Sequence, residues 1–330
     1  MKTNLAAVIS NSIKAEAMRL GFSACGIARA EAVDAPTQAV FNDWLKQGGN
    51  AEMEYMTNYP DLRFDPRQLL PGCQSVISLA LNYYPSQKLT SSQCQFAYYA
   101  YGKDYHDVMR RKMQQLAEFI DNISQQVNKS TGQQVSPTRG DSEGSSFRLC
   151  VDTAPILERY WAERTGIGWI GKNHMLIIPG KGSFHVLGEI LTTIPLLYDE
   201  PMTNRCGDCT RCLQACPNKA LHLDGYFDSS HCLSYLSIEY RGQFDSPDKA
   251  RSISNLHPYI YGCDRCQLVC PHNREAEPTQ VAEFHPTSEF LRMTPADWQS
   301  LTLEQYQHLF RGSAVKRVKY AGLKRNIDLG

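Results

Sequence analysis

The sequence predicts an α/β (α+β) domain, followed by a smaller cysteine-rich domain and a short helical tail with basic charge. Three observations support this organisation. Apolar patterns of helix and strand type alternate up to about residue 200, eight of the 12 cysteines lie between residues 206 and 270, and the chain after Pro286 is helical in pattern with a basic end. We therefore divide the chain into residues 1–200, 201–285 and 286–330.

The composition describes a soluble globular protein of about two domains, with 330 residues, 34 Lys plus Arg and 34 Asp plus Glu. No stretch reaches the roughly 18 consecutive apolar residues of a membrane span, and residues 1–21 carry no twin-Arg pair. We expect a cytoplasmic protein that does not bind a membrane. The balanced charge argues against a surface coated in basic residues, but it leaves room for a local basic face.

In the first domain, helix and strand patterns follow one another in order. A helix is predicted over residues 6–20, a strand over 22–28, a second strand over 75–81 and a long helix over 104–127. Residues 128–146 hold one large apolar side chain, Val135, so they are expected to form a mobile surface loop. A strand over 147–151, a helix that begins at Pro155 and ends at Gly166, and strands over 175–178 and 184–194 complete the domain.

The cysteines of the second domain have the spacing of bacterial ferredoxins. Cys206-x2-Cys209-x2-Cys212-x3-Cys216-Pro is the ferredoxin run, whose fourth cysteine ligates the other cluster. The second half, Cys263-x2-Cys266-x3-Cys270-Pro, lacks one cysteine, which Cys232 supplies. We predict a ferredoxin-like domain with two 4Fe-4S clusters, one held by Cys206, Cys209, Cys212 and Cys270, the other by Cys216, Cys232, Cys263 and Cys266.

Zinc sites and disulfides are the alternatives for these cysteines. Two all-cysteine zinc sites would also need four thiolates each, but zinc sites commonly use separated CxxC pairs and not a triple CxxCxxC. A disulfide framework would need an oxidising compartment. The remaining four cysteines, at positions 25, 73, 94 and 150, lie in or near apolar segments and are expected to be small buried side chains.

Several motifs outside the cysteine run are similar to those of the epoxyqueuosine reductases, cobalamin-dependent iron-sulfur enzymes that complete queuosine synthesis at the tRNA wobble position. They are YGKDYH at residues 101–106, VDTAP at 151–155, GWIGKN at 168–173 and GCDRC at 262–266. The resemblance covers nearly the whole chain. It implies removal of an epoxide oxygen from a cyclopentane ring to leave an alkene, which takes two electrons and two protons and releases water.

The resemblance also implies that cob(I)alamin collects electrons that the clusters deliver singly. The leaving oxygen then needs a proton, and the family's proton donor falls on Asp152. Asp152 is expected at the carboxyl end of a strand, just before the helix opened by Pro155, where α/β proteins place their sites. The alternative is a plain helix cap made by Asp152 or Thr153. A helix N-terminus favours a charged carboxylate, whereas a general acid must begin protonated.

Motif matches alone suggest the contacts with cobalamin, which are Arg67, His106, Asp152, Asn173 and Asp264. His106 has an alternative role as an ordinary satisfied histidine, and we do not expect it to be a cobalt ligand. Asp264 lies between two cluster cysteines and would place cobalamin beside the second cluster.

The tRNA is expected to contact a basic stripe. Its candidate residues are Arg241, Lys316, Arg317, Lys319, Lys324 and Arg325. The alternative is a solvated helix face without a ligand. Base flipping would bring the wobble nucleoside to the cofactor.

Two competing functions remain open at this point. One is a corrinoid enzyme like the reductive dehalogenases, which share the cobalamin and double-cluster plan but typically carry a twin-Arg signal. The other is a non-enzymatic ferredoxin-like electron carrier. For the reductase, we expect a monomer that receives electrons from an external low-potential donor.

Overall fold

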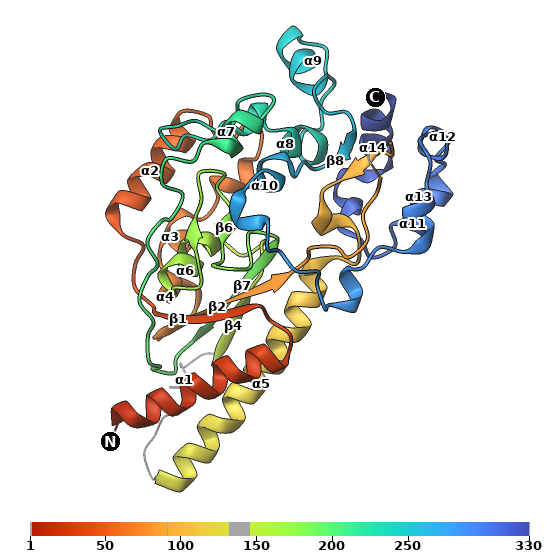
Figure 1. Ribbon diagram of the computed structural model, residues 1–330. Helices are drawn as coiled ribbons and strands as arrows, with labels where there is room; N and C mark the ends of the chain where they lie inside the picture. Colours follow the sequence, from red (N-terminus) through yellow and green to blue (C-terminus); the bar gives the residue numbers. More distant parts are fainter. Residues whose placement is uncertain (1, 91, 132–145, 330) are drawn as a thin grey trace.

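The centre of the protein is one four-stranded antiparallel sheet. The computed structural model describes residues 2–90, 92–131 and 146–329 (Figure 1). The strands are β1 (Ala24–Arg29), β2 (Ser75–Asn82), β7 (His185–Thr192) and β4 (Phe147–Cys150), in the order β1-β2-β7-β4. Each neighbouring pair is antiparallel, and the register places Cys150 of β4 opposite Glu189 of β7. The predicted mixed fold class is confirmed, and the sheet direction makes it α+β.

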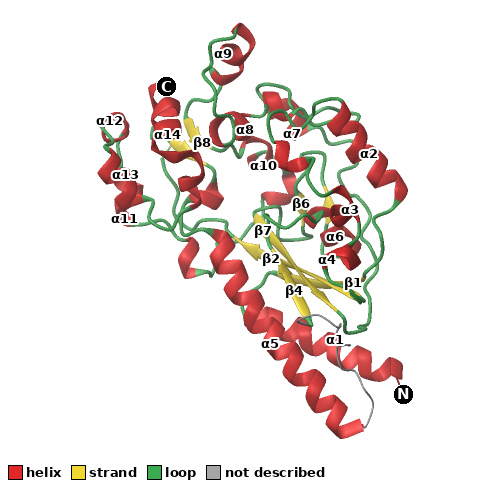
Figure 2. Cartoon of the chain, turned by 180° about the vertical axis from the view of Figure 1, so that it is seen from behind, coloured by secondary structure: helices red, strands yellow, loops and turns green. Residues whose placement is uncertain are grey.

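Helices cover both faces of this sheet (Figures 1 and 2). Helices α1 (Lys2–Arg19) and α5 (Tyr105–Thr131) pack on one face, where Ile13 and Met113 share a buried cluster with Ile77 of β2. Helix α6 (Glu158–Arg164) covers the other face, where its Trp161 packs against Leu191. Strands buried on both faces are continuous apolar runs, as in parallel sheets. The apolar pattern therefore predicted the strands but not their direction.

Close packing of α5 depends on a glycine. A Cβ atom at Gly188 of β7 would lie 2.8 Å from the Met113 sulfur and 2.9 Å from the Met109 methyl group. Contacts this short would force the two methionine side chains to shift, so Gly188 lets them pack directly on the strand.

The helix and strand predictions hold with local differences. The long helix predicted over residues 104–127 is α5, which continues to Thr131. The first four residues of the loop expected over 128–146 are therefore helical, and residues 132–145 lie outside the described part of the chain. The helix predicted to begin at Pro155 begins three residues later, at Glu158, because residues 152–156 form turns.

The remaining elements before the cysteines are short. They are α2 (Ala35–Lys46), α3 (Pro60–Phe64), α4 (Pro66–Leu69), β3 (Gln95–Phe96), β5 (Trp169–Ile170) and β6 (Leu176–Ile177). Two one-turn 3-10 helices lie between these elements, Glu54–Met56 (η1) and Tyr98–Ala100 (η2). A third, Ser229–His231 (η3), lies in the cysteine-rich segment. β5 and β6 form a hairpin whose turn carries the end of the GWIGKN motif.

The cysteine-rich segment has little regular structure and is anchored by the first half of the chain. Its elements are α7 (Arg211–Ala215), α8 (Leu233–Ile238), α9 (Pro247–Ile253), β8 (Tyr259–Tyr261) and α10 (Arg265–Leu268). β8 pairs in parallel with β3, which lies some 160 residues earlier in the chain. The carboxylate of Asp264 also accepts a hydrogen bond of 2.7 Å from the backbone N–H of Tyr98.

The C-terminal segment is packed into the same core. It contains α11 (Ser288–Arg292), α12 (Pro295–Gln299), α13 (Leu303–Leu309) and α14 (Lys319–Asp328), with 3-10 turns at Pro271–Asn273, Ala282–Phe284 and Ala314–Val318. The ring of Phe96 lies 5.1 Å from those of Phe290 and Trp298 and 5.8 Å from that of Phe310. One hydrophobic core thus crosses the predicted boundaries near residues 200 and 285.

Among the described helices, none combines the length and apolar character that crossing a membrane requires.

Candidate redox and catalytic site

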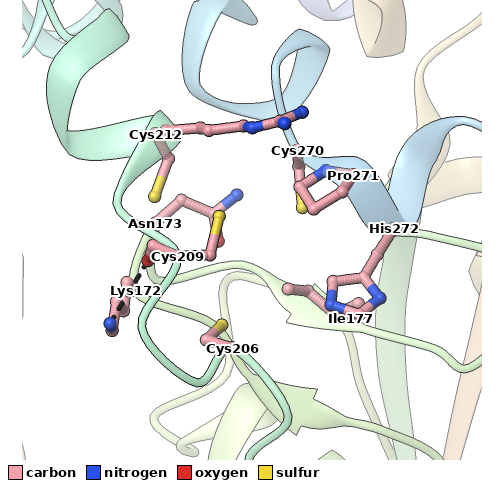
Figure 3. Close-up of a pocket in the computed structure, with 10 residues that line it drawn as sticks. Lys172, Asn173, Ile177, Cys206, Cys209, Cys212, Cys270, Pro271 and His272 are labelled. Carbon is pink, nitrogen blue, oxygen red and sulfur yellow. Dashed lines mark hydrogen bonds between the residues drawn. The ribbon is translucent and has the colours of Figure 1, made fainter.

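Four cysteines from two distant segments line one pocket. Cys206, Cys209 and Cys212 lie on the loop before and at the start of α7, and Cys270 follows α10. Figure 3 shows the four sulfur atoms facing a common space. Gly207 has a φ of +50°, a conformation that glycine adopts without strain and that turns the loop between the first two cysteines. These are the cysteines assigned to the first cluster from their spacing.

The other four cysteines, Cys216, Cys232, Cys263 and Cys266, form a second group whose thiols lie close enough to influence one another's ionisation. Burial raises the pKa of the Cys232 and Cys263 thiols to about 12. Burial also raises the pKa of Cys266 well above its usual value, and the nearby thiols of Cys263, Cys232 and Cys216 raise it further. Thiols in such a setting become thiolates only when a cationic group binds them. The donor set therefore fits a metal cluster, and it is the set assigned to the second cluster.

Within the described residues, no three His, Cys, Asp or Glu side chains converge on a position that would suit a single metal ion.

Asp152 lies in a strained turn just after β4. Its φ is +52°, in the left-handed region that asparagine and aspartate tolerate better than most residues. The turn is held by Glu158, whose Oε1 accepts a hydrogen bond of 2.5 Å from the Asp152 backbone N–H. The Asp152 side chain is 56% exposed. It does not cap α6, whose N-cap is Leu157 without a side-chain hydrogen bond, so the helix-cap alternative is not what the structure shows.

His106 joins Asp152 to a second carboxylate. Its Nε2 lies 3.1 Å from Asp152 Oδ2 and its Nδ1 lies 2.6 Å from Asp104 Oδ1. Burial alone would lower the pKa of His106, but the hydrogen bonds and charges of Asp104 and Asp152 outweigh it and raise the pKa from 6.5 to about 9. The imidazole is therefore protonated at neutral pH. The ring of Tyr105 stacks on it at 4.1 Å.

Two glutamates beneath Asp152 were missed by the sequence reasoning. Burial raises the pKa of Glu158 to about 7, although the hydrogen bond from the Asp152 amide opposes the rise. Glu189 is fully buried under α6, and its Oε2 has no hydrogen-bond partner among the described residues. Burial and the nearby charge of Glu158 raise the pKa of Glu189 well above its usual value. One signal could have found Glu189, since it is the only carboxylate in the apolar run 184–194.

The C-terminal segment reaches the neighbourhood of Asp152. The charge of Asp152 contributes to raising the pKa of Arg317, although the hydrogen bond to Glu239 has the largest effect. Arg317 binds Glu239 through two hydrogen bonds, of 2.8 and 3.0 Å. Asp152 also acts on Tyr55, whose pKa rises to about 12, first because of burial and then because of Glu239. These four residues come from four separate segments of the chain.

The other three residues predicted near cobalamin, Arg67, Asn173 and Asp264, lie in three different settings. Arg67 pairs with Asp65 through two hydrogen bonds of 2.8 Å. Asp264 is buried, and its oxygens accept hydrogen bonds from Tyr98 N and Gln267 Nε2. Asn173 lines the pocket of the first cysteine group (Figure 3). The structure thus brings His106 to Asp152, whereas Arg67, Asn173 and Asp264 each lie in a different place.

The basic residues predicted to contact tRNA fall into two kinds. Lys316 and Lys319 are exposed, and Arg241 donates a hydrogen bond of 2.8 Å to the backbone oxygen of Arg317. By contrast, all donor nitrogens of Arg325 are used within the protein, where they reach the backbone oxygens of Tyr240, Gly242 and Leu236 and the side chain of Asn326. Lys324 contacts Asp328 at 3.1 Å and the backbone oxygen of Gln299.

Comparisons with known proteins agree with this arrangement. The family model "Epoxyqueuosine reductase QueG, DUF1730" matches residues 63–153, and "4Fe-4S double cluster binding domain" matches residues 205–273. The second match identifies the cysteine-rich segment as a double iron-sulfur domain, so the zinc alternative is set aside.

Curated relatives match over nearly the whole chain. The epoxyqueuosine reductase of Cellulophaga algicola is 41% identical over 97% of both chains. That of Vibrio cholerae is 36% identical over 97% of this chain and 82% of its own length.

Solved structures show the same fold. An epoxyqueuosine reductase in complex with an epoxyqueuosine-modified stem loop of tRNA-Tyr aligns with a TM-score of 0.80, at 27% identity over 97% of this chain and 80% of that one. The Bacillus subtilis enzyme, solved with the loop of its catalytic aspartate swung out of the active site, aligns with a TM-score of 0.79 at 26% identity. A reductive dehalogenase aligns with a TM-score of only 0.41 at 16% identity, which is too low to support any inference. The chain therefore belongs to the epoxyqueuosine reductase family.

Proposed function

We propose that this protein reduces epoxyqueuosine to queuosine in tRNA. The observation that carries the proposal is the hydrogen-bonded row Asp104–His106–Asp152, in which His106 holds a proton. The same protein brings eight cysteines together in two groups of four. Removal of the epoxide oxygen as water takes two electrons and two protons. The cysteine groups account for the electrons, and the Asp152 site accounts for a proton.

The ligands we assign to the two clusters are the two cysteine groups described above. When bound, 4Fe-4S clusters supply one-electron steps at low potential. Lys172 steadies the loop of the first group, because its Nζ donates hydrogen bonds to the backbone oxygens of Gly207 at 2.7 Å and Cys209 at 3.2 Å. An external low-potential donor would reduce the clusters.

Cobalamin, which the sequence resemblance implies, would lie beside Asp152. Tyr55 in the 3-10 turn Glu54–Met56 and Tyr59 just before α3 leave 46% and 66% of their surface exposed, and the charge of Asp152 reaches Tyr55. Cofactor sites commonly combine aromatic side chains with a few polar groups, so these residues are our candidates for contact with cobalamin. When bound, cobalamin would supply a centre that stores the two electrons. Asp264 accepts hydrogen bonds from Tyr98 N and Gln267 Nε2, so it also holds the second cysteine group and the residues around Tyr98 together.

Asp152 is our candidate for the residue that protonates the leaving oxygen. His106 carries a proton at neutral pH and shares it with Asp152 Oδ2 across 3.1 Å, while Asp104 keeps the imidazole oriented from the other side. Asp152 would pass this proton to the leaving oxygen, and the pair would then recover it from solvent. The swung-out aspartate loop of the Bacillus subtilis enzyme supports the assignment, since the strained turn at Asp152 is held mainly by Glu158.

The tRNA would bind across the exposed basic residues of the C-terminal segment. Arg317 lies nearest to the Asp152 site and is flanked by Arg241, Lys316 and Lys319. Phosphate contacts at these positions would place the anticodon loop beside Asp152. Lys324 and Arg325 contribute to folding through their contacts within the chain, so we expect them to matter less for RNA.

Iron and sulfide analysis tests the cluster assignment. Anaerobically reconstituted protein should contain about eight iron and about eight sulfide per chain, because two cubes need eight thiolates. Cys232→Ser should reduce the iron content toward about four, since it removes one ligand of the second group. Stoichiometric zinc in place of iron would contradict the assignment.

Asp152→Asn should keep the clusters and the bound cofactor but lower turnover by about 10²- to 10⁴-fold, because the amide preserves size and lacks the ionisable proton. Single-turnover assays on tRNA that carries epoxyqueuosine, with saturating reductant, measure this directly. Wild-type turnover in this variant would exclude Asp152 as the general acid, and loss of cofactor would point to a binding role.

Turnover should fall as pH rises through about 9, because the His106–Asp152 pair then loses its proton. Asp104→Asn should move this fall to lower pH by roughly one unit or more, since it removes one of the two carboxylates that raise the pKa of His106. The measurement is the pH profile of single-turnover rates for both proteins. An alkaline limb at the same pH in both would show that His106 does not govern the step.

Neutralising Lys316, Arg317 and Lys319 to Gln should weaken tRNA binding and reduce the slope of log K against log salt by up to about 2–3, because each phosphate contact releases counterions. A matched control neutralises Arg19, Arg29 and Lys46, whose side chains are 67–76% exposed on other parts of the molecule. The control should bind like wild type. Equal slopes in all three proteins would make the basic stripe a solvated surface only.

A further inference from the structure

A buried amide without a partner points into the first cysteine pocket. Asn173 is 3% exposed, and its side-chain Nδ2 has no hydrogen-bond partner among the described residues. A buried donor left without an acceptor destabilises the folded state. Such a group therefore calls for an explanation, and a bound species that supplies the missing acceptor is one.

The orientation of this amide is fixed by its other end. Asn173 Oδ1 accepts a hydrogen bond of 3.2 Å from the backbone N–H of Met175. A flipped amide would place its NH2 group against that N–H, so the nitrogen must be the end that faces the pocket. Gly171 makes room for this arrangement, because a Cβ there would lie 2.8 Å from Asn173 Oδ1.

The nitrogen lies among the cysteines of the first group. Asn173 lines the same pocket as Cys206, Cys209, Cys212 and Cys270. In Figure 3 its amide nitrogen extends into the space between the sulfur atoms of Cys209, Cys212 and Cys270.

The turn that carries Asn173 is fastened to the cysteine loop. The neighbouring residue Lys172 binds the backbone oxygens of Gly207 and Cys209. Backbone hydrogen bonds from Gly171 N to Met175 O and from His174 N to Gly171 O close the turn. Asn173 is therefore held in place by residues on both sides and has little freedom to turn its amide elsewhere.

We propose that Asn173 donates a hydrogen bond from its side-chain amide to a sulfur atom of the iron-sulfur cluster held by Cys206, Cys209, Cys212 and Cys270, and so raises the reduction potential of that cluster. A reduced cluster carries one more negative charge than an oxidised one, and hydrogen bonds to its sulfurs stabilise that charge. Asn173 thus tunes how readily this cluster accepts an electron. The inference rests on the iron-sulfur part of the proposed function and not on the substrate.

The test is a redox titration of the reconstituted holoenzyme, followed by electron paramagnetic resonance, without tRNA. Asn173→Leu removes the donor without adding charge. At a fixed potential near the wild-type midpoint, the reduced-to-oxidised ratio of one cluster should fall about tenfold, equivalent to 59 mV for a one-electron couple. The other cluster should keep its potential, and the iron content should stay at about eight per chain.

Asn173→Asp is the second variant, because it keeps the acceptor for Met175 N, replaces the donor by a carboxylate oxygen and adds a negative charge. It should lower the same potential at least as much. Asn204→Asp is its charge control: Asn204 Oδ1 accepts from Cys206 N at 2.8 Å, so the added charge lies near the same loop without loss of an inward donor. The control should change the potential less than Asn173→Asp.

If both cluster potentials are unchanged in an Asn173→Leu or Asn173→Asp protein that holds its full iron content, the inference is overturned. A shift in Asn173→Asp that Asn204→Asp matches, with no shift in Asn173→Leu, would also overturn it, because charge alone would then explain the effect. If the wild-type protein holds no iron-sulfur clusters, the failure lies instead with the cluster assignment.

Discussion

The cysteine-rich segment has too little regular structure to fix its own shape, so the rest of the chain must fix it. Four contacts do this. Asp264 binds the backbone of Tyr98, β8 pairs with β3, Lys172 holds the backbone oxygens of the first cysteine loop, and Asn273 Oδ1 accepts a hydrogen bond of 2.6 Å from the backbone N–H of Ser183. Each contact joins the cysteines to the domain that carries Asp152. The cysteine-rich segment and the domain that carries Asp152 are therefore packed together by contacts from several parts of the chain.

The site around Asp152 combines several carboxylates with a few cations. Asp104 and Asp152 both hydrogen bond to His106, Glu158 feels the charges of Arg159 and His106, and Glu189 lies buried beneath them. This excess of acids explains why the proton on His106 is held firmly. Arg317, which also feels the charge of Asp152, is itself tied to Glu239 by two hydrogen bonds.

The sequence was sufficient wherever covalent spacing or a long apolar pattern decides the structure. The two groups of cysteines follow from spacing, and α5, β2 and β7 follow from periodicity. Sheet direction did not follow, because strands buried on both faces have the same pattern in parallel and antiparallel sheets. The contacts of Arg325 and the place of Asn173 did not follow either. A basic residue in a basic run and an asparagine in a turn each suit several partners. Only the folded chain shows that Arg325 reaches backbone carbonyls and that Asn173 lines the pocket of the first cysteine group.

Glu189 has a consequence for the protein as a whole. Its pKa in the folded state lies well above the usual 4.5, because it is buried in the apolar layer between the sheet and α6. At pH values between 4.5 and the pKa of Glu189 in the folded state, the folded chain holds a proton that the unfolded chain has released. Folding is therefore coupled to proton uptake in this range. The contribution of this residue is most favourable below pH 4.5 and weakens as pH rises toward the folded-state pKa. A carboxyl group in the central strand thus makes the enzyme's stability decline toward alkaline conditions, in the same direction in which His106 loses its proton.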